Sequence, residues 1–189
     1  VSIAMVIDDH DMNAAWNISR SWLEDMRREP WWHERAVSGL MSYWIYQHLG
    51  NLSPAQVRAE GLLDRLLAES DGTELLRRWA FESESSTPLP GGYRFSTVRE
   101  VGDVTVVMVD CRNSRVLEPG RRLMVDDDEW EWLAGRARET SGHLVLATPL
   151  PVFVADGVHD LQVWNEAVCD GVWGRRAARI GERVRRSLD

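Results

Sequence analysis

The sequence Ile3-Ala-Met-Val-Ile-Asp-Asp-His-Asp11 joins a short apolar run to three carboxylates and an imidazole. Apolar residues 3–7 are typical of a buried strand, and the polar residues after them predict a loop. In open α/β sheets, ligands bind at the carboxyl ends of the strands. The sequence therefore predicts a site for a ligand or a metal ion at residues 8–11.

The charges of this loop need compensation. Asp8, Asp9 and Asp11 repel one another unless a cation or ordered hydrogen bonds balance them, and His10 lies among them. Carboxylate oxygens are hard ligands that suit Ca²⁺, Mg²⁺, Mn²⁺ or iron. A solvated acidic loop that caps the next helix is the alternative, and the pattern alone leaves both interpretations open.

Helical patterns follow the loop. Ser19 is placed to cap a first helix, and Ser53-Pro-Ala-Gln56 has the composition of a helix start. Apolar residues then recur with the helical period. We expect helices over about 19–28, 31–49, 53–70 and 73–84, and a loop over 87–92, which contains prolines and glycines.

From residue 91 the pattern becomes that of strands and helices in alternation. Residues 93–98 alternate with a period of two, and the apolar runs 104–109 and 144–147 are typical of strands covered on both faces. Helices are expected from Asp126 to about Glu139 and from about Leu161 onward, with a break near 171–174. This order predicts an α/β fold, with a helical part over about 18–85 and a strand and helix part over about 91–189.

Composition narrows the function classes. The 189 residues carry a net charge of −8, which argues against general binding of nucleic acid. No apolar run is long enough to span a bilayer. The ten tryptophans predict a core rich in indoles. Cys111 and Cys169 are expected to be free buried thiols.

Six arginines lie between Arg175 and Arg186. A basic helical stripe of this kind binds nucleic acid in some proteins. It is equally typical of a solvated face, or of a surface that covers acidic groups elsewhere in the chain. With the net charge of the chain negative, we expect no nucleic-acid partner.

Several segments together point to a known family. Asp8-Asp-His-Asp11, with Trp16-Asn17 shortly after, is similar to the pattern DDHE…NNW. Gly91-Gly-Tyr-Arg-Phe95, Val109-Asp-Cys-Arg112 and Trp164-Asn-Glu166 match further segments in the same order. In this combination, which spans nearly all 189 residues, the chain resembles the PhoD-like alkaline phosphatases of the calcineurin-like metallophosphoesterase superfamily.

The resemblance implies a fold, a reaction and cofactors. The fold is part of a four-layer α/β/β/α sandwich with a helical insertion. The reaction is the hydrolysis of phosphate mono- or diesters at a two-metal centre, where the cations clamp the phosphate and activate a water. Calcium with iron is the pairing that the family suggests, and manganese or magnesium is the alternative.

The resemblance also implies roles for the residues of the loop. Asp9 takes the place of a metal ligand. Asp8 takes the place of a further metal ligand, or of a hydrogen-bond acceptor next to the ligands. His10 takes the place of the histidine that contacts the phosphate and protonates the leaving group. Asp11 is expected to orient that imidazole.

Arg112 and Asn17 are expected to bind the substrate. The guanidinium of Arg112 either steadies a phosphate or pairs with a carboxylate of the site. A structural ion pair with Asp110 or Glu118 is an equal alternative for Arg112.

The chain also departs from the family pattern. Ala14 and Ala15 stand where the family has Asn or Asp, and neither side chain binds a metal. The remaining ligands of the family are expected before Ile3 and after Asp189, so the sequence is expected to be an incomplete portion that is inactive by itself. A degenerate, non-catalytic binding or scaffold domain is the first alternative, and an unrelated helical protein that binds a partner is the second. We expect a cytoplasmic location, with export as the alternative, and the sequence indicates no oligomeric state.

Overall fold

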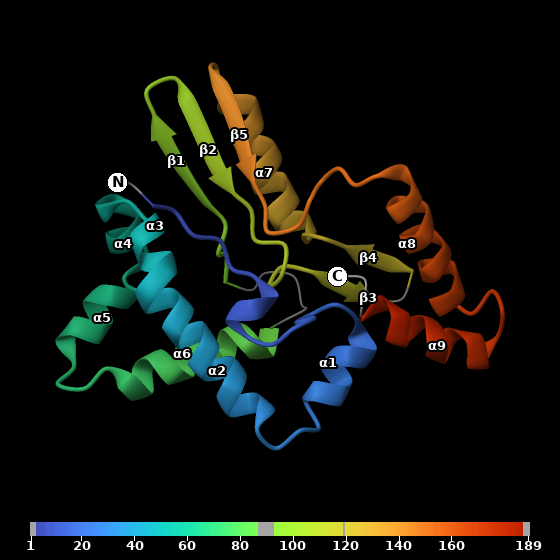
Figure 1. The fold of residues 1–189 in the computed structure, drawn as a ribbon. Coiled ribbons are helices and arrows are strands. Elements are labelled where there is room, and N and C mark those ends of the chain that lie inside the picture. The colour runs from blue at the N-terminus through green and yellow to red at the C-terminus, as the bar shows by residue number, and fades with distance from the viewer. Residues whose placement is uncertain (1–2, 87–92, 119, 187–189) are drawn as a thin grey trace.

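A computed structural model describes residues 3–86, 93–118 and 120–186 of the chain. The fold is mixed α/β, which confirms the predicted class (Figure 1). Helices α2 to α6 lie on one side, and the three strands β1, β2 and β5 stand above them with α7 behind (Figure 1). Helices α8 and α9 form a separate pair on the opposite side of the molecule (Figure 1). The loop predicted over 87–92 lies outside the described residues.

Local signals set most helix boundaries in the first half. Ser19 Oγ accepts the Trp22 N–H at 3.2 Å, and Ser53 and Gln56 bond reciprocally to each other's backbone N–H groups, as the sequence predicts. The single helix expected over 53–70 is two helices, because Gly61 adopts the left-handed conformation with φ 66°. The elements are α1 Arg20–Met26, α2 Trp32–Tyr43, the π-helix Trp44–His48, α3 Leu49–Asn51, α4 Pro54–Glu60, α5 Leu62–Ala68 and α6 Thr73–Ser86.

The second half forms the sheet. Strands β1 Thr97–Val101 and β2 Val104–Met108 are antiparallel, and β5 His143–Ala147 runs parallel to β2, which gives the order β1-β2-β5. Helix α7 Asp127–Glu139 makes the crossover between the parallel strands, and the Asp126 side chain caps it through the Glu129 N–H. A short antiparallel pair, β3 Val116–Glu118 and β4 Arg121–Leu123, was not expected from the sequence.

The last two helices are α8 Asp156–Cys169 and α9 Arg175–Arg185, with the predicted break between them. Gly171 and Gly174 at this break have φ values of 91° and 86°, which other residues rarely adopt. No helix in the described ranges is both long and apolar enough to cross a membrane.

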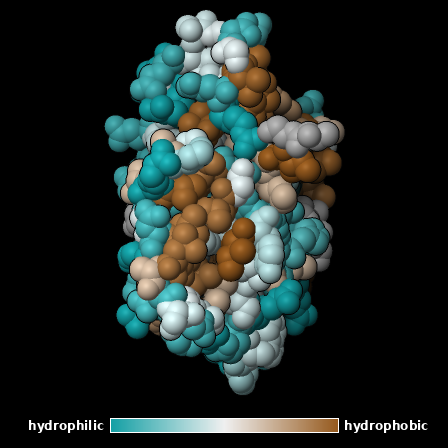
Figure 2. Space-filling view, turned by 90° about the vertical axis from the view of Figure 1, so that its left-hand side faces the viewer, coloured by the Kyte–Doolittle hydropathy of each residue, from teal (hydrophilic) through white to brown (hydrophobic). Residues whose placement is uncertain are grey.

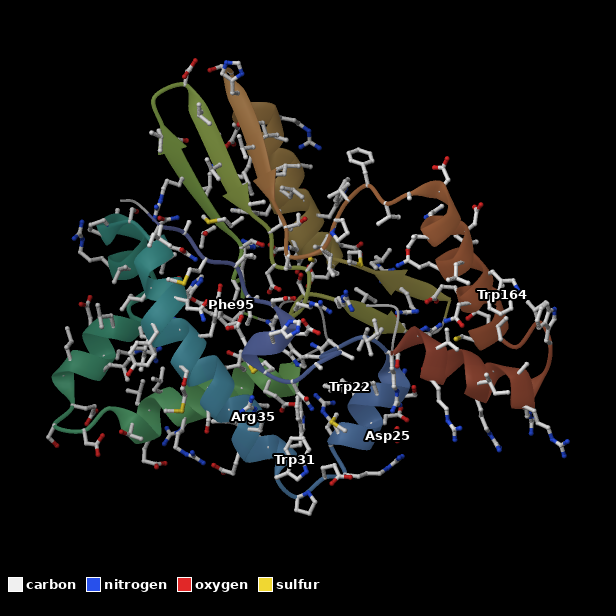
Figure 3. The ribbon with its side chains drawn as sticks, in the orientation of Figure 1. Trp22, Asp25, Trp31, Arg35, Phe95 and Trp164 are labelled. Atoms are coloured by element: carbon white, nitrogen blue, oxygen red, sulfur yellow. The ribbon has the colours of Figure 1, made fainter. Side chains whose placement is uncertain are left out.

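The core lies where α2 meets α1, α6 and the start of the sheet. Trp22 and Trp32 pack edge to face at 5.3 Å, and Tyr43 packs in the same way on Phe95 at 5.2 Å. Each such pair adds about 0.5–1.5 kcal/mol beyond its buried area. Trp22 and Phe95, both labelled in Figure 3, are buried. The expectation of an indole-rich core holds for Trp16, Trp22, Trp32 and Trp44, while Trp31, Trp130, Trp164 and Trp173 are exposed.

Apolar side chains also reach the surface. Figure 2 shows the face that carries α4 and α5, with an area of apolar side chains in its middle. Leu67 of α5 is among the exposed large hydrophobic residues. Of the two cysteines, Cys111 is buried and Cys169 half-buried, and both are free thiols. Burial raises the pKa of the Cys111 thiol to about 11, as expected for an unreactive buried cysteine.

The prediction of a buried strand over residues 3–7 is wrong. Among the described residues the segment pairs with no strand, and Ile3 and Met5 are exposed. Its backbone groups bind side chains instead. The Asn51 amide accepts the Met5 N–H at 2.9 Å and donates to the Met5 carbonyl at 2.5 Å, as a neighbouring strand would do. A polar side chain therefore takes the place of a strand partner, and the segment needs no sheet.

The strand expected at 144–147 forms, but it is not covered on both faces. Leu144, Val145 and Leu146 of β5 are between 37% and 49% exposed, because β5 lies at an edge of the three-stranded sheet. Within the described residues, no strand pairs with its outer edge. The four-layer sandwich thus stays a hypothesis, while the α/β class is established.

Two glycines, one inside α7 and one in the connection from α7 to β5, predict opposite effects of the same substitution. A Cβ on Gly135, inside α7, would meet nothing within 4 Å, so Gly135→Ala is expected to raise the free energy of unfolding by about 0.5–1 kcal/mol. A Cβ on Gly142 would lie 2.0 Å from the Asp103 carbonyl oxygen, which also accepts the His143 N–H. Gly142→Ala is expected to lower the free energy of unfolding, measured by urea denaturation, and equal effects of both substitutions would contradict the structure.

Candidate functional site

The acidic loop is folded into one turn of 3-10 helix, Asp9–Asp11, with Asp8 preceding it. The Asp11 carboxylate closes this turn, because its Oδ2 accepts the Asp8 N–H at 2.9 Å. Its other oxygen accepts a hydrogen bond from Gln47 Nε2, also at 2.9 Å. Asp11 is thus held between its own turn and the π-helix. The π-helical geometry adds a residue to the helical turn, which is frequent near functional sites.

Helix α2 packs against the turn. Gly39 allows the close approach, since a Cβ at this position would lie 2.3 Å from the Met12 sulfur. Arg35 Nε donates to the Met12 carbonyl at 2.7 Å, and Figure 3 shows Arg35 on the same helix. The acidic turn is therefore a supported part of the fold.

Arg112 joins the turn to the sheet. Its Nε donates to Asp8 Oδ1 at 3.0 Å, and its Nη2 lies 3.2 Å from Asp9 Oδ1. The Arg112 side chain is only 3% exposed. Arg112 follows the carboxyl end of β2, where the parallel strand pair ends. Residues that are more than a hundred positions apart thus meet at the sheet edge where α/β proteins bind ligands.

Asp110 fixes the backbone from which Arg112 projects. Its Oδ1 accepts the N–H groups of Arg112 and Asn113, at 2.8 and 2.9 Å. Burial raises the pKa of Asp110 to about 7, and the negative charge of nearby Glu129 acts in the same direction. The hydrogen bonds from the two N–H groups act in the opposite direction, because they stabilise the charged carboxylate. The other carboxylate oxygen of Asp110 is buried without a hydrogen-bond partner. The Asp110 carboxyl group therefore has a structural role in holding the backbone of the site.

His10 is the exposed member of the cluster. Its side chain is 82% exposed, and its Nδ1 lies 2.9 Å from Asp9 Oδ1 and 3.3 Å from Asp8 Oδ2. The hydrogen bond to Asp8 and the negative charges of Asp9 and Asp8 raise the pKa of the His10 imidazole. Burial acts to raise the pKa of Asp8, but the Asp9 N–H, His10 and Arg112 outweigh it and lower that pKa. The imidazole therefore keeps its proton to higher pH than a free histidine.

Three of these groups are arranged as metal ligands would be. Asp8, Asp9 and His10 each offer one ligand atom, and these atoms lie within 4.8 Å of one another. Two carboxylates and an imidazole fit a divalent or trivalent cation of the harder kind. A cation bound there would compete with the Arg112 guanidinium, because this group already balances the charges of both carboxylates.

The loop after the turn is held in a strained conformation. Ala15 and Asn17 have φ values of 64° and 55°, which cost non-glycine residues about 1–2 kcal/mol each. Hydrogen bonds stabilise this conformation. The Ala15 N–H donates to Asp9 Oδ2 at 2.8 Å, and Asn17 Nδ2 donates to the Arg112 carbonyl at 3.1 Å. Strain of this kind is common at functional sites, where the surroundings enforce it.

The structure brings Asp8, Asp9, His10 and Arg112 together, and it corrects two of the expected roles. Asp11 does not orient the His10 imidazole, since its oxygens bind Gln47 and the Asp8 N–H, while Asp8 and Asp9 contact His10. Asn17 is fully buried and bonded to backbone, so it is closed to a substrate.

The structure supports one of the alternatives for Arg112, the pairing of its guanidinium with carboxylates of the site. The guanidinium contacts Asp8 and Asp9, and not Asp110 or Glu118 as the other alternative expected. Its burial leaves no open face for substrate binding in this conformation. Sequence reasoning missed Gln47, Gly39 and the Ala15 N–H. A glycine in the middle of an amphipathic helix was the available signal for Gly39.

No family model, curated protein or solved structure matches the chain.

The buried Asp110 carboxyl predicts a pH dependence of stability. Because its pKa rises to about 7 on folding, the folded chain binds this proton more tightly than the unfolded chain. The contribution is complete below about pH 4 and is lost as the pH rises toward 7, so the free energy of unfolding falls over this range, by roughly 1–4 kcal/mol from this group. Asp110→Asn keeps an acceptor for the two N–H groups and is expected to flatten the profile measured by urea denaturation. An unchanged slope in Asp110→Asn, with exposed Asp64→Asn as the control, would contradict this assignment.

The strained loop predicts that the neighbouring residues Ala15 and Ala14 respond differently to the same substitution. Valine tolerates the left-handed conformation worse than alanine, so Ala15→Val is expected to lower the free energy of unfolding by about 1–3 kcal/mol. Ala14 is exposed and is not among the residues with positive φ, so Ala14→Val is expected to change it by less than about 0.5 kcal/mol. Thermal or urea unfolding of the two variants makes the comparison, and equal losses would rule out a special role for the Ala15 backbone.

Proposed function

We propose that the chain belongs to a metal-dependent hydrolase of phosphate mono- or diesters, of the alkaline phosphatase or phosphodiesterase type. The supporting observation is the convergence of Asp8, Asp9 and His10 within 4.8 Å at the carboxyl end of β2, with Arg112 against the two carboxylates. The similarity of these segments to the PhoD-like pattern adds the reaction type. We extend the proposal to the fold, with β1, β2 and β5 as part of a four-layer α/β/β/α sandwich.

Asp8 and Asp9 are the residues that would hold a cation. They are carboxylates on one turn, fixed by backbone and arginine contacts, and calcium with iron, manganese or magnesium are cations of suitable hardness. A metal pair bound at such a centre supplies a Lewis acid for the phosphate and an activated water. The Ala15 N–H on Asp9 keeps one carboxylate oxygen in a fixed direction.

His10 is suited to donate a proton to the leaving group. Its exposed imidazole is accessible to a substrate, while Asp8 and Asp9 hold its Nδ1. A general acid must also reach the leaving group, and the 82% exposure of the His10 side chain meets this condition. Arg112 would act as a positioning residue, since it contacts the two carboxylates and is closed to substrate.

A second candidate is a non-catalytic binding or scaffold domain that keeps the fold. The observation that favours it is the double contact of Arg112, which balances Asp8 and Asp9 without any metal. Ala14 and Ala15 agree with it, because they offer no ligand atoms where the resembled family has Asn or Asp.

Metal titration and phosphate-ester hydrolysis test the proposal together. We expect calorimetry to show Mn²⁺ or Ca²⁺ binding that Asp9→Asn weakens at least about tenfold, because a buried ligand is lost. His10→Ala is expected to lower p-nitrophenyl phosphate hydrolysis by the full-length protein by about 10²–10⁴-fold, with chelator abolishing the activity. Exposed Asp160→Asn is the control for the loss of one charge.

The outcomes separate the two candidates. Absence of hydrolysis by the full-length protein, whether or not a cation binds, would favour the binding domain. The phosphatase proposal would be abandoned if no cation bound, or if the activity survived both the chelator and the substitution of His10.

A further inference from the structure

The turn between α8 and α9 presents large apolar side chains to solvent. Val172, Trp173 and Ile180 are 71%, 64% and 63% exposed. Trp173 packs edge to face on Trp164 at 5.5 Å, which fixes its ring on the surface, and Figure 3 shows Trp164 at this end of the molecule. Exposed indole and aliphatic groups at one end of a molecule are unusual on a surface that stays in water.

Five of the six arginines of this region fall into two groups. Arg185 and Arg186 cover acidic surface, since Arg185 pairs with Glu166 and Glu182 and Arg186 with Asp25. The second group consists of Arg175, Arg176 and Arg179, which are exposed. Within the described part of the chain, these three make no hydrogen bond or ion pair. Only part of the basic stripe therefore serves the expected role of covering acidic groups.

The packing of α9 directs the second group outward. Gly181 faces α8, because a Cβ there would lie 2.9 Å from the Cys169 sulfur. Arg176 and Ile180 are four residues apart and so lie together on another side of the helix, which is exposed. Arg176 and Ile180 thus share one exposed side of α9, which follows directly on the exposed turn residues Val172 and Trp173. We call it the α9 surface, and it consists of Val172, Trp173, Arg175, Arg176, Arg179 and Ile180.

We propose that the α9 surface binds the face of an anionic lipid bilayer. Guanidinium groups are attracted to lipid phosphates, and the exposed Trp, Val and Ile side chains enter the boundary between headgroups and acyl chains. The charge distribution agrees, since the exposed Arg175, Arg176 and Arg179 have no acidic partner among the described residues, although the chain has a net charge of −8. Attraction to a planar anionic surface therefore turns this end of the molecule toward the bilayer.

Nucleic acid fits the same surface less well. A phosphate backbone offers nothing for Val172 and Ile180, and a long polyanion that extends past α9 meets the acidic remainder of the chain. The inference is independent of the proposed phosphatase activity, because no residue of the α9 surface belongs to the Asp8–Arg112 site.

Co-sedimentation with vesicles tests the proposal. We expect the protein to bind vesicles of phosphatidylcholine mixed with phosphatidylglycerol, and not vesicles of phosphatidylcholine alone. The triple variant Arg175→Gln/Arg176→Gln/Arg179→Gln is expected to bind on the order of a hundred-fold more weakly, at about five-fold per arginine. Trp173→Ala is expected to weaken binding while leaving the charge unchanged.

The matched control changes the same number of exposed arginines elsewhere. Arg58→Gln/Arg65→Gln/Arg138→Gln, on α4, α5 and α7, is expected to bind anionic vesicles as the parent does. The proposal is overturned if anionic vesicles are not bound, or if both triple variants lose binding equally. It is also overturned if a single-stranded oligonucleotide binds instead, or if Trp173→Ala breaks a dimer, since another partner would then cover this surface.

Discussion

The contact of one guanidinium with two carboxylates organises this molecule. Arg112 reaches from the end of β2 to Asp8 and Asp9, and it connects the N-terminal turn to the sheet. Removing one partner of such a buried group leaves an uncompensated charge, which costs about 3–5 kcal/mol. The cluster therefore has two consistent interpretations: the arginine is either the permanent counterion of the turn or the group that keeps ligand carboxylates in place.

The sequence predicted the elements whose signals are local. The caps at Ser19, Ser53 and Asp126 and the break near Gly171 place helix ends close to where they are observed, because a side chain three residues away or a positive φ decides them. The composition of residues 3–7 did not predict their conformation. The partner that decides it, Asn51, lies 46 positions away and is not itself part of a strand.

The same limit applies to the site. The residue types of the acidic turn indicated ligand chemistry, and Asp8, Asp9 and His10 do converge. The sequence did not predict the direction in which each side chain points, because that direction depends on hydrogen bonds with residues far away in the chain. Gln47 draws Asp11 away from the imidazole, and Asn17 is turned inward onto the Arg112 carbonyl by its left-handed backbone.

The position of β5 has a consequence for the behaviour of the protein in concentrated solution. Within the described residues its outer edge is unpaired, and the run His143-Leu-Val-Leu-Ala147 contains no lysine or proline of the kind that protects natural strand edges. An extended chain that meets this edge finds free amide and carbonyl groups flanked by aliphatic side chains. We expect aggregation at high protein concentration to begin at this edge. The purified chain is therefore best kept at low concentration, or with the β5 edge covered.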